Sequence, residues 1–352
     1  MKNTEILFET ESKEAESYFY GANTKSGFIL TPDGLIGESG CNIKVYIKGG
    51  PGTGKSALIR RFAARAEELG YGVTYYYCSF DPSSLDSAVA QKGDKRICVC
   101  DATEPHAADP EYPGAVSFTF DVSEFFDVGA LRLYRDEIFV HTARKKDSFD
   151  RAYACLHAAG EVMSALDSLL DGCTDTEKLE KFATRTASRY KAEGGVRKVI
   201  VSAHTMSGAV RLDTLRRKAE RVYSVTDTLG ISRAVIPALY RAFAARGVGC
   251  DVAISPLDGS VDAIFIRDEK VLYTKDPGAS VINGERFAVR DAGSRRARIR
   301  FFKKCVASLT GEALKCLSSA SPYHFELEKI FSKNVDFVSS TEAFDKRVIS
   351  LL

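Results

Sequence analysis

One glycine-rich segment limits what this chain can fold into more than any other. It reads Gly49-Gly50-Pro51-Gly52-Thr53-Gly54-Lys55-Ser56 and matches the pattern G-x-x-x-x-G-K-[ST] in full. A short run rich in β-branched and aromatic residues precedes it over 44–48, and apolar residues at helical spacing follow it as far as Gly70. This pattern predicts a strand, a loop and a helix that ends near Gly70.

Each residue type in this segment suits the binding of phosphate. The glycines allow successive backbone N–H groups to converge on phosphate oxygens at the start of a helix. Lys55 supplies a full positive charge, and the hydroxyl of Ser56 is a suitable ligand for Mg²⁺. The alternative is a glycine-rich turn with an incidental Lys-Ser pair. The nucleotide-binding residues that we expect are Gly49, Gly50, Pro51, Gly52, Thr53, Gly54, Lys55, Ser56 and Ala57.

An acidic residue at the end of a neighbouring strand should complete a Mg²⁺ site beside such a loop. Residues 96–100 read as a strand buried in a sheet, and Asp101 follows them directly. Asp101 is therefore the candidate second Mg²⁺ ligand and, with Lys55, a candidate catalytic residue. The alternative is that Asp101 only starts a turn.

Four more side chains follow strand ends of the expected sheet and could face the terminal phosphate: Asp81, Asp86, Glu104 and His106. One of them could orient water or act as a base, and Asp81 and Glu104 complete the predicted catalytic set. The alternative for Asp81 and Asp86 is that they cap turns and the helix that we expect next.

The chain repeats itself about halfway along. Residues from Val222 onward align without a gap with residues from Val45 onward, and this alignment places Asp258 under Asp81. Because glycines and other turn residues also coincide, we interpret the chain as two copies of one unit.

A helical hairpin is expected behind each copy. Apolar residues recur at helical spacing over 149–170 and again over 302–317. Thr174 and Glu177 would form a capping box for a further helix, and Pro322 would open another.

The second copy lacks the residues that the chemistry needs. Ser232 stands where the first copy has Lys55, Asp227 would oppose phosphate, and Pro237 would delay the following helix. The strand that should carry the acid ends instead in Lys275. We therefore expect one nucleotide site per chain, and a second half with a structural or regulatory role.

The loop and the acid resemble those of the P-loop NTPase superfamily over about residues 43–120. More closely, the chain resembles a bacterial family of tandem P-loop ATP-binding proteins. Beyond the loop, the likeness lies in Cys78–Asp86, Asp101–Pro110 and Pro113–Ala115, and it spans nearly the whole chain. The resemblance implies ATP binding. In that family the second half keeps a P-loop, whereas this chain departs from it at both the lysine and the acid.

The predicted fold is α/β, with two tandem P-loop-type α/β sandwich domains. Each is expected to be a parallel sheet flanked by helices, and the second copy is degenerate. The expected boundaries are a nucleotide-binding domain at 1–125, a helical segment at 126–195, the degenerate domain at 196–284 and a C-terminal helical segment at 285–352.

Charge limits the partners of such a chain. Its 49 Lys and Arg residues against 47 Asp and Glu argue against a surface built wholly to follow nucleic acid or an anionic membrane. The segment Arg286–Lys304 is strongly basic, and we interpret it as a solvated helix face, with contact to nucleic acid as the alternative.

The chain shows no sign of export. Its first residues turn acidic before an apolar stretch develops, and nowhere do about 18 apolar residues run together, so we expect neither a signal peptide nor a membrane span. Nine scattered cysteines are typical of reduced cytoplasmic thiols. Cys98 and Cys100 read as core thiols rather than as a metal site.

We therefore expect a cytoplasmic ATPase that requires ATP and Mg²⁺, in which hydrolysis shifts the two halves relative to each other. A kinase for a small molecule or nucleotide is one alternative, with Asp81 or Asp86 as its base. A non-catalytic adaptor that responds to nucleotide and acts through a protein partner is the other. The base is not specified, since no N-K-x-D guanine signature occurs.

Overall fold

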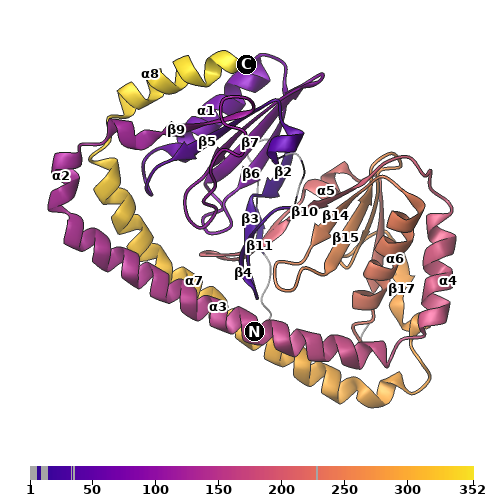
Figure 1. Ribbon diagram of the computed structural model, residues 1–352. Coiled ribbons are helices and arrows are strands. Elements are labelled where there is room, and N and C mark those ends of the chain that lie inside the picture. Colours follow the sequence, from indigo (N-terminus) through magenta and orange to yellow (C-terminus); the bar gives the residue numbers. More distant parts are fainter. Residues whose placement is uncertain (1–5, 9–14, 33, 35, 227–228) are drawn as a thin grey trace.

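Two α/β units and a pair of long helices make up the computed structural model, which describes residues 6–8, 15–32, 34, 36–226 and 229–352 (Figure 1). Each unit is a mixed sheet flanked by helices. Asp227, which the sequence placed opposite phosphate, lies outside the described residues. No helix among these residues is both long and apolar enough to cross a membrane.

The first sheet has the strand order β2-β6-β7-β8-β5-β9. These strands are Glu16–Phe19 (β2), Gly72–Tyr77 (β6), Leu85–Lys92 (β7), Lys95–Asp101 (β8), Ile43–Lys48 (β5) and Ser117–Asp121 (β9). β7 runs antiparallel to both of its neighbours, so the expectation of a wholly parallel sheet is wrong. β7 also stands where a helix was expected. Its first six residues are all buried, as suits a strand in the middle of a sheet.

The second sheet has the order β10-β14-β15-β16-β13-β17. These strands are Val196–Val199 (β10), Cys250–Ile254 (β14), Val261–Ile266 (β15), Val271–Thr274 (β16), Arg221–Thr226 (β13) and Ser280–Asn283 (β17). Each strand has the same direction relative to its neighbours as its counterpart in the first sheet. Even the register shifts coincide, one between Tyr76 and Tyr77 and the other between Ala253 and Ile254.

One helix covers a face of each sheet. In the first unit this is α1 (Lys55–Glu68), which ends before Gly70 at φ 77°, as predicted. In the second unit it is α6 (Ser232–Arg246). Pro237 lies inside α6 and does not delay its start, because a proline there removes a single backbone hydrogen bond that the packing of the buried helix outweighs.

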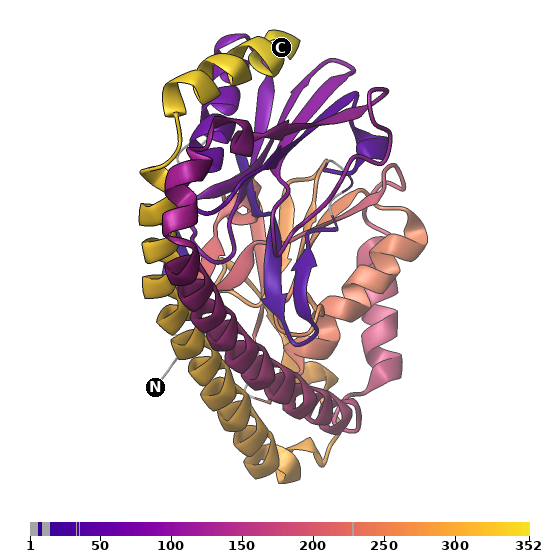
Figure 2. The ribbon, with the colours of Figure 1, turned by 60° about the vertical axis from the view of Figure 1, so that its left-hand side comes forward.

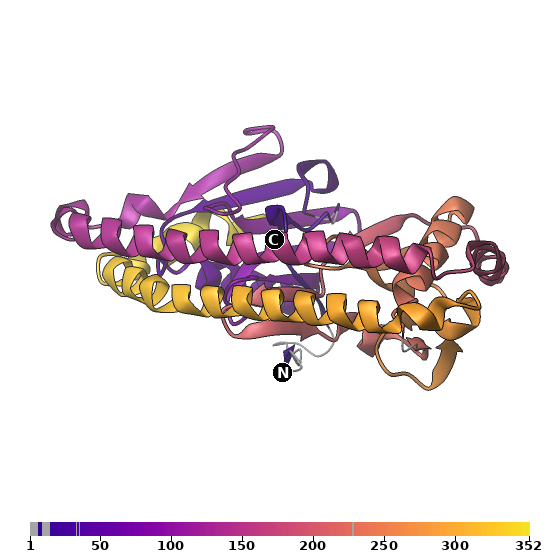
Figure 3. The ribbon, with the colours of Figure 1, turned by 90° about the horizontal axis from the view of Figure 1, so that it is seen from below.

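The two long helices α3 (Arg135–Asp171) and α7 (Arg296–Ser332) lie side by side and antiparallel along both units (Figures 2 and 3). Each has 37 residues. α7 passes through Pro322, so the prediction that a helix opens there is wrong: packing along α3 holds the helix continuous.

Each long helix leads to a short one on the opposite unit. α3 starts beside the first unit, after α2 (Val128–Leu133), and leads to α4 (Thr176–Ala187), which packs on α6. α7 starts beside the second unit and leads to α8 (Phe337–Arg347), whose Phe344 joins the core of the first. The helices that follow each copy therefore complete the other.

The start of α4 differs from the predicted capping box. Asp175, not Thr174, caps the helix, and its side chain accepts a hydrogen bond from the backbone N–H of Lys178. The Thr174 hydroxyl instead donates to the carbonyl of Leu170.

The remaining elements join the halves. They are β1 (Ile6–Phe8), β3 (Gly21–Thr24), β4 (Gly27–Leu30), β11 (Ser202–Thr205), β12 (Gly208–Leu212) and α5 (Thr214–Lys218). Asn23 Nδ2 donates to the carbonyl of His204 at 3.0 Å. In two matching bonds, the N–H of Lys25 donates to the carbonyl of Leu257 and that of Met206 to the carbonyl of Phe80.

Candidate functional site

The glycine-rich loop lies between β5 and α1, with its lysine turned back onto it. Lys55 Nζ donates to the carbonyl oxygens of Gly49 at 3.0 Å and Gly50 at 2.6 Å. Gly52 and Gly54 have φ angles of 69° and 85°, which favour glycine. The loop therefore has backbone angles that glycine favours at these two positions, and the buried ammonium of Lys55 lies at its centre.

Asp101 lies beside this loop because β8 pairs in parallel with β5, which sets Asp101 opposite Ile47. Asp101 Oδ2 is 3.5 Å from Lys55 Nζ, and Oδ1 accepts a hydrogen bond from the backbone N–H of Thr103. Burial raises the pKa of Asp101 above its ordinary 3.8, although the charges of Lys55 and His106 oppose this. The structure therefore brings together the two residues that the sequence placed at the centre of the site.

Two more buried side chains join Asp101. His106 Nε2 lies 3.4 Å from Asp86 Oδ2, and His106 Nδ1 lies 4.0 Å from Asp101 Oδ1. The rings of Tyr20 and Phe28 pack against the imidazole with centroids 5.3 and 5.9 Å away. Burial by itself lowers the pKa of His106, but the carboxylates of Asp86 and Asp101 outweigh it and raise this pKa above 6.5.

Ser56, at the start of α1, contacts the start of β7. Its Oγ accepts hydrogen bonds from the backbone N–H of Leu85 at 2.9 Å and from Arg60 at 2.6 Å. Leu85 directly precedes Asp86, so the hydroxyl lies between the start of α1 and the start of β7.

Asp81 and Glu104 lie outside this group of side chains. Asp81 Oδ1 accepts bonds from the N–H and hydroxyl of Ser83, at 3.0 and 2.7 Å, which is the turn-forming role given above as its alternative. The side chain of Glu104 is exposed.

Helices from the other half cover the loop. A Cβ added to Gly50 would lie 3.1 Å from the ring of Phe331, and one added to Gly54 would lie 3.0 Å from the ring of Phe337. At Gly52 it would lie 2.6 Å from the Cα of Glu328. The end of α7 and the start of α8 thus close over all three glycines.

Three polar side chains on these helices, next to the loop, were not predicted from the sequence. Lys145 of α3 lies with Nζ 3.0 Å from His324 Nδ1 of α7, and His324 Nε2 is 3.4 Å from Glu328 Oε1. Burial lowers the pKa of Lys145 below 10.5, and the charge of Lys55 lowers it further. The local pattern around Lys145 shows only a helix. The i, i+4 spacing of His324 and Glu328 was the one available signal.

A buried carboxylate supports the segment that carries His106. Glu38 accepts hydrogen bonds from the N–H groups of Glu111 and Tyr112, and from the hydroxyls of Tyr46 and Ser117. Burial raises the pKa of Glu38, but these four bonds outweigh it and hold the pKa at about 2.

In the second unit, Arg233 and Lys275 stand at positions that correspond to the candidate site of the first unit, and both form ion pairs. Arg233 aligns with Ser56, and its guanidinium pairs with Asp167 of α3 at 2.6 and 2.8 Å and with Asp258 at 2.6 Å. Lys275 pairs with Asp262 of β15 at 2.5 Å. Asp167, Asp258 and Asp262 are therefore each paired with a lysine or an arginine side chain.

Lys275 corresponds to Asp101, as the sequence predicts. Asp86 and Asp262 lie in matching bulges, and the next strand places Cys100 opposite Ser87 in the first sheet and Thr274 opposite Ala263 in the second. The residue after each is Asp101 in the first unit and Lys275 in the second.

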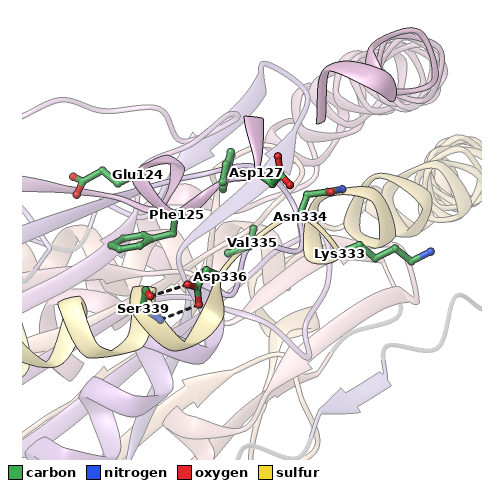
Figure 4. Close-up of a pocket in the computed structure, with 9 residues that line it drawn as sticks. Glu124, Phe125, Asp127, Lys333, Asn334, Val335, Asp336 and Ser339 are labelled. Carbon is green, nitrogen blue, oxygen red and sulfur yellow. Dashed lines mark hydrogen bonds between the residues drawn. The ribbon is translucent and has the colours of Figure 1, made fainter. Parts of the chain in front are cut away.

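An open hollow of about 560 Å³ lies at the turn between α7 and α8 (Figure 4). Glu124–Asp127 line one side, and Lys333–Asp336 with Ser339 line the other. Asp336 accepts hydrogen bonds from the N–H and hydroxyl of Ser339, which caps α8. Neither Lys55 nor Asp101 lines this hollow, so it is separate from the loop.

Comparison of the chain with protein-family models, with curated proteins and with solved structures gave no match. All nine cysteines are free thiols, and Cys98 and Cys100 are buried.

Proposed function

We propose that the chain is a Mg²⁺-dependent ATP-binding protein of the P-loop NTPase type, an ATPase with one nucleotide site in its N-terminal half. One observation carries the proposal: Lys55, held at the centre of the glycine-rich loop, lies 3.5 Å from Asp101 at the end of the adjacent parallel strand. A loop, a lysine and an acid in this arrangement suit the triphosphate of a nucleotide.

The residues present fit a magnesium ion. Ser56 and Asp101 offer the oxygen donors that Mg²⁺ prefers, and they would hold the ion against the phosphates and neutralise their charge. Arg60, which donates to Ser56 Oγ in the structure, would have to turn away from the hydroxyl for the ion to bind there. Lys55 exchanges the carbonyls of Gly49 and Gly50 for phosphate oxygens when the nucleotide binds. Because phosphoryl transfer depends mainly on position and charge, we assign Lys145 as a second cation over the loop.

The second half is proposed to be a degenerate copy of the first. The two sheets share strand order and direction, which supports duplication. Arg233 stands where the first copy has Ser56 and is held between two acids, so its guanidinium occupies the place where a nucleotide would need a metal ligand. This half acts as structure and as a support for α7 and α8.

Nucleotide binding is proposed to move the two halves. Glu328 and Phe331 belong to the second half and lie against the loop of the first. A triphosphate in the loop therefore displaces the end of α7, and hydrolysis allows it to return. Because all nine cysteines are free thiols, we also propose a cytoplasmic location.

Thermal unfolding with and without Mg-ATP tests the proposal. At 100 times its dissociation constant a ligand adds about 2.7 kcal/mol, and each kcal/mol raises the midpoint by roughly 2–4 °C in domains of this size. We expect such a rise in the wild type and in Lys146→Ala, an exposed neighbour on α3, and no rise in Lys55→Ala. Equal rises in all three proteins, or none in the wild type, would contradict nucleotide binding at this loop.

Release of phosphate then separates the possible activities. We expect slow release from ATP by the wild type that is lost in Lys55→Ala. Turnover only in the presence of an added acceptor would indicate a kinase. Binding without any turnover would indicate a nucleotide-responsive adaptor.

A further inference from the structure

Asp86, Asp101 and His106 form a compact group of buried ligand atoms. Each side chain offers one atom that lies within 4.8 Å of the others, and all three residues are buried. Within the described part of the chain, no other set of His, Cys, Asp and Glu side chains gathers in this way. They come from β7, from β8 and from the loop after β8, so the sheet itself sets their positions.

His106 has one nitrogen engaged and one free. Nε2 faces Asp86 Oδ2 at 3.4 Å, whereas Nδ1 makes no hydrogen bond to any described residue and points toward Asp101 Oδ1 at 4.0 Å. The side chain of His106 is only 5% exposed, so water does not readily satisfy this nitrogen. A buried polar atom without a partner costs free energy, and a native protein keeps one where it has a use.

We propose that His106 Nδ1 and Asp101 bind a first-row transition-metal dication of the Mn²⁺ class, with Asp86 holding the imidazole in place. A carboxylate that accepts from the far nitrogen of a ligand histidine fixes the ring and its tautomer in metal sites. Two bonds of about 2.0–2.2 Å from a metal to nitrogen and oxygen reach across the 4.0 Å between the two atoms when the ion lies nearly between them. Asp101 Oδ1 already accepts from the N–H and the hydroxyl of Thr103, so these hydrogen bonds have to shift when the ion enters. One imidazole with carboxylate oxygens favours manganese or its neighbours over magnesium.

The inference deepens the proposed function and rests on it in one respect, because Asp101 is also the acid assigned to the nucleotide's ion. Lys55 Nζ lies 3.5 Å from Asp101, so the ammonium and a dication compete for the same carboxylate. A triphosphate that draws Lys55 away frees Asp101 for the metal. Nucleotide should therefore tighten metal binding, and metal should tighten nucleotide binding by the same factor.

The fixed cation in the second half supports this assignment. Asp262 of β15 lies at the position of Asp86 in β7, and Lys275 pairs with it at 2.5 Å. In the second unit, which lacks a histidine at this position, the ammonium of Lys275 supplies the positive charge beside Asp262.

Electron paramagnetic resonance with Mn²⁺ tests the site on the intact chain. The ion is titrated with and without a non-hydrolysable ATP analogue, in the presence of excess Mg²⁺. We expect electron spin echo modulation from a directly bonded ¹⁴N in the wild type. His106→Ala should lose this signal and at least about tenfold of the preference for Mn²⁺ over Mg²⁺. The matched control is His157→Ala, an exposed histidine on α3, which should keep both. His106→Gln, of similar bulk, repeats the measurement if the alanine variant is poorly folded.

The outcomes separate the two proposals. Mn²⁺ without nitrogen coupling in the wild type, or an unchanged metal preference in His106→Gln, would overturn the transition-metal site. A Lys55-dependent rise in the unfolding temperature with Mg-ATP would still support the nucleotide site in that case. Nitrogen-coupled Mn²⁺ in a protein that shows no response to ATP would support the metal site and overturn the nucleotide site.

Discussion

Gly52 and Glu328 meet backbone to backbone across the two halves of the chain: a Cβ on Gly52 would lie 2.6 Å from both the Cα and the carbonyl oxygen of Glu328. No side chain fits between them. The contact joins the tip of the glycine-rich loop to the end of a helix that begins on the other unit. Loop and helix are therefore in direct contact, and a shift of either backbone at this point requires the other to adjust.

Gly52→Ala should destabilise the protein more than its backbone angle alone explains. Gly93, in the exposed turn between β7 and β8, has a similar positive φ of 58° and nothing within 4 Å of an added Cβ. We expect Gly93→Ala to cost about 1–2 kcal/mol from the left-handed backbone. Gly52→Ala should cost about 1–3 kcal/mol more, because α7 has to shift. Urea unfolding of both variants measures the difference, and equal losses would show that α7 does not press on the loop in solution.

Removing Arg233 should destabilise the second unit strongly. The guanidinium is 15% exposed and pairs with Asp167 and Asp258, so Arg233→Ala leaves two acids without their cation. We expect a loss of about 3–5 kcal/mol in the free energy of unfolding. Arg241→Ala, which breaks an exposed pair with Glu180, should cost at most about 1 kcal/mol. Similar small losses in both variants would contradict a structural role for Arg233.

The pH dependence of stability should report on the same pair. Burial raises the pKa of Asp258, but Arg233 outweighs it and holds the pKa at about 2, below the ordinary 3.8. A carboxyl with a lowered pKa stabilises the fold above the unfolded value and loses this effect as the pH falls toward the folded one. About 2 kcal/mol should therefore disappear between about pH 4 and pH 2 in the wild type. Urea unfolding across this range should show a shallower fall in Arg233→Ala, and an identical fall would contradict the pairing.

Local patterns were enough to predict the loop, its strand and its helix, because neighbouring residues decide all three. They indicated Asp86 as one of the side chains that could face the phosphate, but they placed a helix after it, whereas Asp86 lies in a strand that burial on both faces specifies. They failed again at Pro322, where packing along α3 outweighs one lost hydrogen bond. Lys145 and Glu328 reach the site because the long helices cross to the opposite unit, and contacts of that range leave no periodic signal in a single sequence.

Glu38→Gln should weaken the segment that carries His106. The carboxylate of Glu38 accepts four hydrogen bonds. An amide has a single acceptor oxygen, and its NH₂ group would face N–H or hydroxyl groups that are themselves donors. We expect a loss of about 2–3 kcal/mol in the free energy of unfolding at pH 7. Glu111→Gln is the control, since its exposed side chain changes while its backbone N–H remains in place. Hydrogen exchange should also show faster opening of residues 104–116 in Glu38→Gln, and unchanged exchange would mean that Glu38 does not anchor this segment.

Lys145→Met should reduce turnover of ATP much more than it reduces stability. The ammonium lies beside His324 and within electrostatic range of Lys55, so methionine keeps the length of the side chain and removes the charge over the loop. Loss of one preorganised donor to a developing charge costs about 10²–10³ in kcat in other enzymes, and we expect a loss of about 10² here. Because burial lowers the pKa of Lys145 from 10.5, wild-type turnover should decline at an alkaline pH below that value, and this decline should be absent in the variant. Lys146→Met, the exposed neighbour, should match the wild type in both respects. If the two variants behave alike while Lys55→Ala is inactive, the loop works without a cation from α3, and the cover formed by the long helices serves only to close the site.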